Sequence, residues 1–322
     1  MKKSAPATGF DHMPLDFGKV RTYSLAKRRS KVRKEDFASL GRKGISFGAF
    51  YKGLPNILAA KDIRNIASAV INARRRKKTV LFLLGAHVIK CGLSPLVIDL
   101  MKRRIVTAVA LNGAGIIHDA ELALVGRTSE DVGTALKDGS FGMARETAEF
   151  VNGAINRGVV RGLGIGAALG EAMENEKLPL RNLSILAAGI RYDCPVTVHV
   201  AIGTDIIHQH PSCNGAAIGE ASLIDFRNIV YSMINLNGGG AALCFGSAII
   251  LPEVFLKALN IARNMGHTVK NFTTANFDMI IHYRPNLNIV KRPTEGGGWG
   301  YNIIGHHEIM MPLLYQMIIE KI

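Results

Sequence analysis

A short apolar segment that ends at glycine and leads into a segment with helical spacing recurs along this chain, and it limits the fold more than any other feature. Residues 79–84 form the first such segment, which ends at Gly85. An uninterrupted apolar run of this length is typical of a strand buried on both faces of a parallel sheet. Further strands are predicted at residues 105–111, 195–202, 241–250 and 277–283.

The segments between these strands have the apolar spacing of helices. Helices are predicted at residues 55–72, 95–104, 135–156, 163–175, 221–236, 252–265 and 312–322. Because strand, loop and helix alternate, the sequence predicts an α/β fold, a doubly wound parallel sheet with right-handed crossovers. The longest apolar runs are far shorter than the ~20 residues of a membrane span, so no membrane partner is expected.

Lysine and arginine are concentrated in the first third of the 322 residues. Residues 1–104 contain 24 Lys and Arg against 6 Asp and Glu, a net charge of +18, while residues 105–322 contain 16 against 19. Apolar residues are sparse before Ile45. We therefore expect a basic arm over residues 1–44 and a folded domain over residues 45–322.

Two basic clusters, at residues 27–34 and 74–78, dominate this region. Such clusters can contact phosphates. A solvated tail and a solvated helix end are the favoured explanation, because neither aromatic interleaving nor a nucleic-acid-binding motif supports a phosphate contact. A nucleic-acid partner is therefore not the first expectation.

The four cysteines are scattered and lack the spacing of a zinc site or a disulfide framework. No metal is expected on this basis, and a reducing cytoplasm is the expected location. The N-terminus lacks the apolar stretch of a signal peptide. Cys244 is expected to be a buried small residue, and Asp278, placed at the start of a strand, to be structural.

Glycine-rich loops follow several predicted strands, where a doubly wound sheet binds its ligands. They lie at residues 85–87, 112–115, 203–205, 238–240 and 296–300. Glycine lets backbone N–H groups approach a phosphate or ribose closely. The sequence contains no P-loop motif, which argues against a P-loop nucleotidase.

At these loops the sequence resembles the deoxyhypusine synthase family over roughly residues 80–318. The similar stretches are Asn-Gly-Ala-Gly-Ile-Ile-His-Asp at 112–119, Gly-Thr-Asp at 203–205, Asn-Gly-Gly-Gly at 237–240, Arg-Pro-Thr-Glu-Gly-Gly-Gly-Trp-Gly at 292–300 and Met-Pro-Leu-Leu at 311–314. The resemblance implies a Rossmann-like fold, a homotetramer and NAD bound between subunits. It also implies transfer of an aminobutyl group from spermidine through an imine on a lysine.

The resemblance implies that Glu295 and Trp299 hold the substrate, but Tyr301 stands where the catalytic lysine is expected. Tyrosine has no amine and cannot form an imine. It can act as a general acid or base, hydrogen-bond a substrate oxygen, or simply pack. Another lysine, of which Lys90, Lys270 and Lys291 are the candidates, is a further alternative.

The remaining candidates divide into cofactor and substrate contacts. The resemblance and the loop positions assign NAD to Gly85, Asn112, Gly113, Gly115, Asp119, Asp205, Gly238, Gly239, Gly240, His306 and His307. Asp119 is expected to accept from a ribose hydroxyl. His208 and His210 are close enough in sequence to move protons or contact substrate, with a metal or plain loop polarity as alternatives.

The segment before the active-site stretch is acidic in the family but basic here, with Arg284 and Arg292. Coulomb attraction would then favour a carboxylate or phosphate over spermidine. Three functions remain open. The first is an NAD-dependent enzyme acting on a small amine or carboxylate, with the lysine-dependent transfer lost. The second is an aminobutyl transferase, of deoxyhypusine or homospermidine synthase type, that uses another lysine. The third is a non-enzymatic nucleotide- or RNA-associated scaffold.

Overall fold

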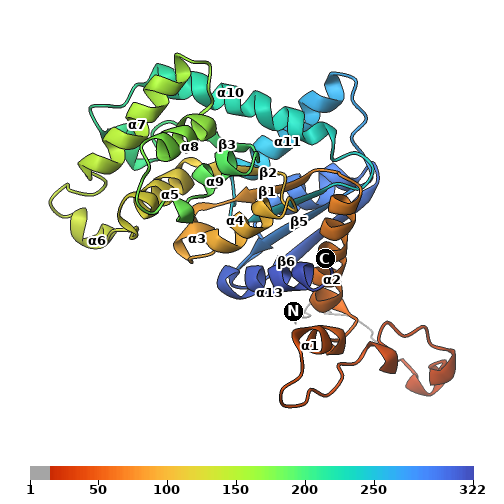
Figure 1. The fold of residues 1–322 in the computed structure, drawn as a ribbon. Helices are drawn as coiled ribbons and strands as arrows, with labels where there is room; N and C mark the ends of the chain where they lie inside the picture. The colour runs from red at the N-terminus through yellow and green to blue at the C-terminus, as the bar shows by residue number, and fades with distance from the viewer. Residues whose placement is uncertain (1–14) are drawn as a thin grey trace, which may run out of the picture.

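The computed structural model describes residues 15–322, so the first fourteen residues of the expected arm lie outside the described part of the chain (Figure 1). Six parallel strands form one sheet in the order β3-β2-β1-β4-β5-β6. They are β1 (Val80–Leu84), β2 (Ala108–Asn112), β3 (Val196–His199), β4 (Ala241–Phe245), β5 (Phe272–Asp278) and β6 (Gly298–Ile304). This order is that of a doubly wound dinucleotide-binding sheet, and the predicted fold class is confirmed.

Helices cover both faces of the sheet (Figure 1). The longer ones are α2 (Leu58–Arg75), α4 (Ser94–Lys102), α5 (Gly113–Val125), α7 (Arg145–Val159), α8 (Ile165–Asn175), α10 (Gly215–Ile234), α11 (Ile250–Asn264) and α13 (His307–Ile319). The shorter ones are α1 (Phe47–Gly53), α3 (Ala86–Lys90), α6 (Val132–Ala135), α9 (Ile185–Arg191) and α12 (Tyr283–Pro285). Single turns η1 to η7 span Phe17–Lys19, Leu25–Lys27, Lys34–Asp36, Arg181–Leu183, Ile206–Gln209, Asn286–Lys291 and Arg292–Thr294.

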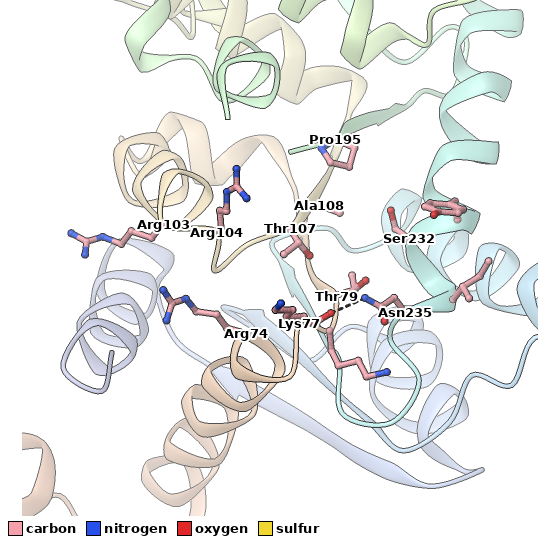
Figure 2. A pocket seen from close by; sticks show the side chains of 13 residues that line it. Arg74, Lys77, Thr79, Arg103, Arg104, Thr107, Ala108, Pro195, Ser232 and Asn235 are labelled. Atoms are coloured by element: carbon pink, nitrogen blue, oxygen red, sulfur yellow. Dashed lines mark hydrogen bonds between the residues drawn. The ribbon is translucent and has the colours of Figure 1, made fainter. Parts of the chain in front are cut away.

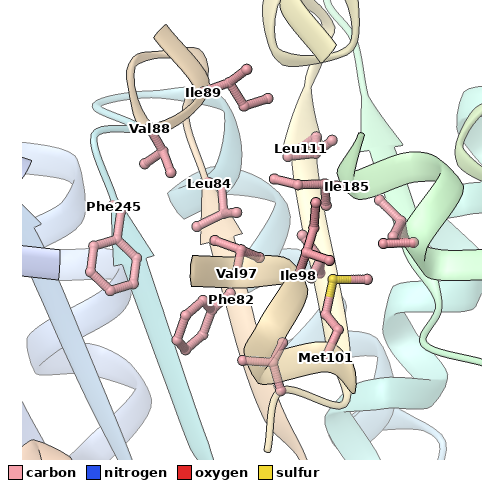
Figure 3. Close-up of a cluster of buried hydrophobic side chains, with 14 of the residues drawn as sticks. Phe82, Leu84, Val88, Ile89, Val97, Ile98, Met101, Leu111, Ile185 and Phe245 are labelled. Carbon is pink, nitrogen blue, oxygen red and sulfur yellow. The ribbon is translucent and has the colours of Figure 1, made fainter. Parts of the chain in front are cut away.

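The fully buried strand β1 supplies both cores, because its alternate side chains point to opposite faces. Phe82 and Leu84 pack in the core beneath α2, α4 and α13, while Leu81 packs in the core beneath α10 and α11. Figure 3 shows α4 lying across the first of these cores, with Val97 beside the strand residues. The Phe82 ring lies 5.3 Å from that of Phe245 on β4, which ties the two central strands together.

The chain changes faces between β1 and β4. Helices α3 to α9, which follow β1 and β2, pack mainly in the first core, whereas α11 packs in the second. Strands β1 and β4 are nevertheless neighbours in the sheet. Their carboxyl ends therefore form the topological switch point at which sheets of this class bind ligands.

Two strands at one edge of the sheet differ from the prediction. Strand β5 is Phe272–Asp278 rather than residues 277–283, because its polar residues Thr274 and Asn276 are buried and hide the apolar pattern. Strand β6, Gly298–Ile304, was expected to be a loop. Its glycines serve close packing, since a Cβ at Gly300 would overlap the carbonyl of Val290.

These shifts move several predicted loops to the other edge of the sheet. Gly238, Gly239 and Gly240 precede β4, and residues 296–297 precede β6, so both glycine loops lie at the amino edge and not at the carboxyl edge. Asp278, expected at the start of a strand, ends β5 and lies at the carboxyl edge. The predicted helix at 135–156 is a short α6 followed by α7, and the closing helix begins earlier, at His307.

Residues 15–46 contain only the three single turns η1 to η3 and extend away from the sheet (Figure 1). Their apolar side chains are exposed, with Leu40 98% exposed. The division into an arm and a domain remains a prediction. Among the described residues, no helix is both long enough and apolar enough to cross a membrane.

Candidate functional site at the carboxyl edge of the sheet

The loops after β1, β4 and β6 come into close contact at the switch point. Gly85 donates its N–H to the carbonyl of Phe245 at 2.8 Å, and a Cβ on Gly85 would overlap the backbone of Gly246. A Cβ on Gly246 would lie only 2.6 Å from Nε2 of His307. Glycine is therefore required at two of these loops, because a side chain would separate the strand ends.

His307 begins α13 and is buried beneath these loops, at 1% exposure. Its ring meets that of His87 edge-on, with centroids 5.7 Å apart. Burial lowers the pKa of His307, although Asp278 opposes that shift. Its Nδ1 has no hydrogen-bond partner within residues 15–322. The imidazole is therefore neutral near pH 7 and keeps one ring nitrogen available.

Helix α5 begins directly after β2, and its first turn holds a carboxylate. The Asn112 side chain caps the helix by accepting from the N–H of Gly115 at 3.0 Å. Asp205, from the loop after β3, packs so closely against the first turn that a Cβ on Gly113 would overlap its carboxylate. Burial raises the pKa of Asp205, with His208 opposing the shift. The structure thus brings four of the predicted cofactor residues together.

His208 orders the loop that carries Asp205. Its Nδ1 accepts from the N–H groups of Gly203 and Asp205, at 3.1 and 3.2 Å. Nδ1 therefore carries no proton, and the proton of the neutral ring lies on Nε2. That Nε2 is buried without a partner in the described part of the chain. His210 instead contacts Ser212 through Nδ1 at 2.8 Å.

A cavity of about 220 Å³ opens beside α5, between this loop and the loop at 128–132. Within it His118 contacts Thr128, which donates to Glu121. Its lining residues are Lys90, Ala114, Ile117, His118, Glu121, Ser129, Glu130, Val132, Phe141, Thr204, Asp205 and Ile206. No role is predicted for Glu121 or Glu130 from the sequence alone. The i to i+3 spacing of His118 and Glu121 on one helix was the signal that was available.

A second cavity, of about 410 Å³, lies on the other side of the β3 carboxyl end and is mostly apolar. His199 lines it and is 3% exposed, and burial lowers the pKa of this histidine to about 4. Its Nε2 forms a hydrogen bond with the hydroxyl of Thr197 at 3.0 Å. This cavity offers apolar walls rather than charge.

Asp119 does not reach the site. It is completely buried, and its carboxylate accepts from the hydroxyl of Ser184 and from the N–H groups of Ile185 and Leu186. The expectation that it binds a ribose hydroxyl is wrong, because these three donors at the start of α9 occupy both of its oxygens. Burial raises the pKa of Asp119 to about 6.

The residues of the active-site stretch lie away from this site within the chain. Trp299 and Tyr301 are on β6, opposite Thr273 and Ala275, and Glu295 precedes the strand. At about 3.3 Å per residue, Trp299 lies roughly 20 Å along the strand from His306. Burial raises the pKa of Tyr301, and a hydrogen bond to Asn65 of α2 opposes this.

The two arginines expected to bind substrate are already engaged. Arg284 pairs with Glu253 at 3.3 Å. Arg292 donates to Asn288 at 2.8 Å, near the start of β6. His306 lies at the carboxyl edge, 3.9 Å from Glu308. Of the three candidate lysines, Lys90 lines the 220 Å³ cavity, whereas Lys270 and Lys291 precede β5 and β6.

These features define a protein of the doubly wound, Rossmann-like α/β class, with titratable groups gathered at the carboxyl edge of its sheet. Neither the family models nor the curated proteins contain a match to the sequence. Similar solved structures do exist, and they share this fold.

One is a conserved protein from Methanococcus maripaludis S2, provisionally described as LOR/SDH, with a TM-score of 0.53 and 13% identity over 82% of this chain and 71% of that one. AgrE in its ternary complex with ornithine and NAD+ has a TM-score of 0.52 and 13% identity over 81% of this chain and 33% of AgrE. A protein from Entamoeba histolytica, provisionally described as a deoxyhypusine synthase, has a TM-score of 0.50 and 11% identity over 86% and 94%.

At these identities the similarity extends to the fold alone. The chain spans about a third of the length of AgrE. The resemblance to deoxyhypusine synthase therefore holds at the level of the fold, where the neighbours also include LOR/SDH-type and AgrE proteins.

Proposed function

We propose that this chain binds NAD at the carboxyl edge of the sheet and transfers a hydride to or from a small amine-bearing substrate. The observation that carries the proposal is the α5 start, where Asn112, Gly113 and Asp205 meet at the edge that contains the switch point. A dinucleotide in this class lies across these strand ends. AgrE, a protein of the same fold, has been solved with ornithine and NAD+.

NAD, when bound, supplies the hydride acceptor. The residues of this chain supply the rest of the site. Because Gly85 and Gly113 have no side chain, the Gly246 backbone and the Asp205 carboxylate can pack directly against them. One carboxylate oxygen of Asp205 has no hydrogen-bond partner among residues 15–322. Buried His307 and the Nε2 proton of His208 are placed to hold or pass a proton.

The cavity beside α5 favours an amine. Glu121, Glu130 and Asp205 line it, against the single cation Lys90. Three carboxylates attract an ammonium group, and Lys90 can pair with a carboxylate on the same molecule. The basic Arg284, which suggested an acidic substrate, does not line this cavity and pairs with Glu253, a carboxylate that Lys257 shares.

Calorimetric titration of NAD+ tests the cofactor assignment, with and without spermidine. We expect the wild-type protein and Gly296→Ala to bind NAD+, because Gly296 lies at the amino edge with open space around it and without a left-handed backbone. Gly113→Ala is expected to lose binding, since its Cβ displaces Asp205 from the α5 start. Equal loss in both variants, or no binding by the wild type, would contradict the proposal.

An aminobutyl transfer is the second candidate function, and the placement of Lys90 favours it. Oxidation of spermidine by NAD+ would give an imine, and the Lys90 amine would add to its carbon and displace 1,3-diaminopropane, forming the lysine imine that Tyr301 cannot form. Incubation with NAD+ and spermidine followed by borohydride should then add mass at Lys90 and not in Lys90→Arg. An unmodified Lys90 would exclude this route. The homotetramer implied by the family resemblance is a prediction that sedimentation can check.

A further inference from the structure

A cavity of about 830 Å³ lies at the amino edge of the sheet, on the side opposite the candidate NAD site (Figure 2). Its walls come from the ends of α2, α4 and α10 and from the starts of β1, β2 and β3. The lining residues are Arg74, Lys77, Lys78, Thr79, Arg103, Arg104, Thr107, Ala108, Pro195, Tyr231, Ser232, Ile234 and Asn235. Five of them are cations and none is a carboxylate.

These cations are poorly compensated. Arg103 pairs with Asp99 at 2.6 Å. Within residues 15–322, Arg74, Lys77, Lys78 and Arg104 form no ion pair. Figure 2 shows Arg74 and Arg104 reaching into the space between the helix ends. Four positive charges thus share one cavity without an acidic neighbour.

Helix C-termini explain part of this charge. Each presents about half a negative charge, so α2, α4 and α10 together offer roughly −1.5. The four unpaired cations exceed this by about +2.5. Capping of helix ends therefore does not account for the cluster.

Two of these cations stand at backbone positions that allow a clean test, as does Lys177 after α8 outside the cavity. Lys77 and Arg104 follow the ends of α2 and α4 with φ of +54° and +53°. Glycine is the usual residue at such left-handed positions after a helix, because a Cβ is strained there. Both positions carry a long cation instead, and both line the cavity.

We propose that this cavity binds a nucleoside triphosphate, or a molecule of the same polyphosphate chemistry, at a site separate from the carboxyl edge. Guanidinium and ammonium groups hold adjacent phosphates. The volume suits a nucleotide. Pro195, Ala108 and Ile234 offer an apolar wall, and the ring of Tyr231, 79% exposed, can stack on a base.

Titration of ATP and of inorganic tripolyphosphate into the full chain tests the site. The diagnostic variant is Lys77→Gly combined with Arg104→Gly, because glycine removes both charges and relieves the strained backbone. We expect affinity for both ligands to fall by about tenfold or more, with a thermal midpoint no lower than that of the wild type. Tyr231→Ala should weaken ATP binding and leave tripolyphosphate binding unchanged.

Arg28→Ala combined with Lys31→Ala is the matched control, since it removes the same charge from the exposed arm. It should bind both ligands as the wild type does. Gly113→Ala should also retain them, which separates this site from the candidate NAD site. Absent binding, equal weakening in the arm control, or binding of single-stranded RNA without binding of ATP would overturn the proposal.

A different observation concerns three donors at the carboxyl edge. His87 and Cys91, four residues apart at α3, and Glu308 in the first turn of α13 place a nitrogen, a sulfur and an oxygen within 4.8 Å of one another. The spacing of sequence motifs predicted no metal because the third donor comes from the far end of the chain. The geometry points to a site for zinc or a similar divalent ion, held by these three ligands and water.

Cobalt(II) is the probe for this site, because a thiolate ligand gives it a near-ultraviolet charge-transfer band. We expect that band in the wild type, its loss in Cys91→Ala, and its retention in Cys213→Ala, a control at another half-buried thiol. Zinc should raise the thermal midpoint of the wild type and not that of Cys91→Ala. A spectrum that is identical in Cys91→Ala would refute the site.

Discussion

At the carboxyl edge of the sheet the helices α5 and α13 begin, whereas at the amino edge α2, α4 and α10 end. The first edge holds Asp205 against a helix start and buries the neutral His307 among glycine loops. The second collects Arg74, Lys77, Lys78 and Arg104 around an open cavity. Helix dipoles of opposite sign thus face side chains of opposite charge at the two edges.

If both proposals hold, one sheet carries two kinds of site. Partial positive charge at helix starts is matched by carboxylates of this chain, so it is already balanced within the protein. Partial negative charge at helix ends is exceeded by cations, which leaves a surplus for a ligand. The two edges therefore differ in how completely side chains of this chain balance the partial charge of the helix ends.

The largest effect is expected where a carboxylate fully balances a helix start. Asp119→Ala leaves the N–H groups of Ile185 and Leu186 and the hydroxyl of Ser184 without their acceptor in a dry environment. We expect a loss of about 3 kcal/mol in the free energy of unfolding. Urea denaturation measures it. A loss near zero would show that helix starts here do not need internal carboxylates.

The second prediction concerns pH. Burial raises the pKa of Asp119 to about 6 and that of Asp225 to about 7. Asp225 accepts from the N–H groups of Gly166 and Val198. Because both folded pKa values lie above the unfolded value near 4, the folded state binds protons more tightly, and stability falls as pH rises between about 4 and 7.

We expect the free energy of unfolding of the wild type to fall steadily between pH 4 and pH 8, as measured by urea denaturation. Asp225→Asn should flatten the upper part of this range, because the amide does not titrate. Stability that rises steadily with pH in the wild type would mean that both carboxylates are stabilised as anions by their N–H donors.

Most of the fold follows from patterns that the sequence displays openly. The run Val80–Leu84 is apolar throughout, and a strand of that kind can be predicted without knowing which residues pack against it. Strand β6 breaks this rule, since the small size of Gly300 matters only because Val290 passes beside it. Tertiary contact, and not propensity, decides such a strand.

The site was harder to predict for the same reason. Asn112 and Gly113 stand directly after a strand, and their sequence position already indicated the carboxyl edge. Gly238 looks equivalent in sequence but precedes β4, and only the strand boundaries reveal this. The partnership of Asp119 with Ser184 joins residues 65 positions apart, which no local spacing can show.

A smaller loss of stability is expected when the side-chain cap at the start of α5 is removed. Asn112→Ala removes the acceptor for the N–H of Gly115, and we expect a loss of about 1 kcal/mol in stability. Thermal denaturation followed by circular dichroism measures it. Asn112→Asp, which preserves an acceptor and adds charge, is the matched control and should retain most of the stability. If the two variants lose the same amount of stability, Asn112 does not stabilise the protein by capping α5.

The smallest effect is expected at the amino edge, where uncompensated cations repel one another. Raising NaCl from 0.15 M to 1 M shortens the screening length from about 8 Å to about 3 Å, which weakens that repulsion. We expect the unfolding free energy of the wild type to rise by roughly 0.5 kcal/mol. The variant with Lys77→Gly and Arg104→Gly should respond less, because it has already lost two of the four charges. A stability that falls with salt equally in both proteins would mean that attractive ion pairs elsewhere dominate the salt response and that repulsion among the four cations contributes nothing measurable.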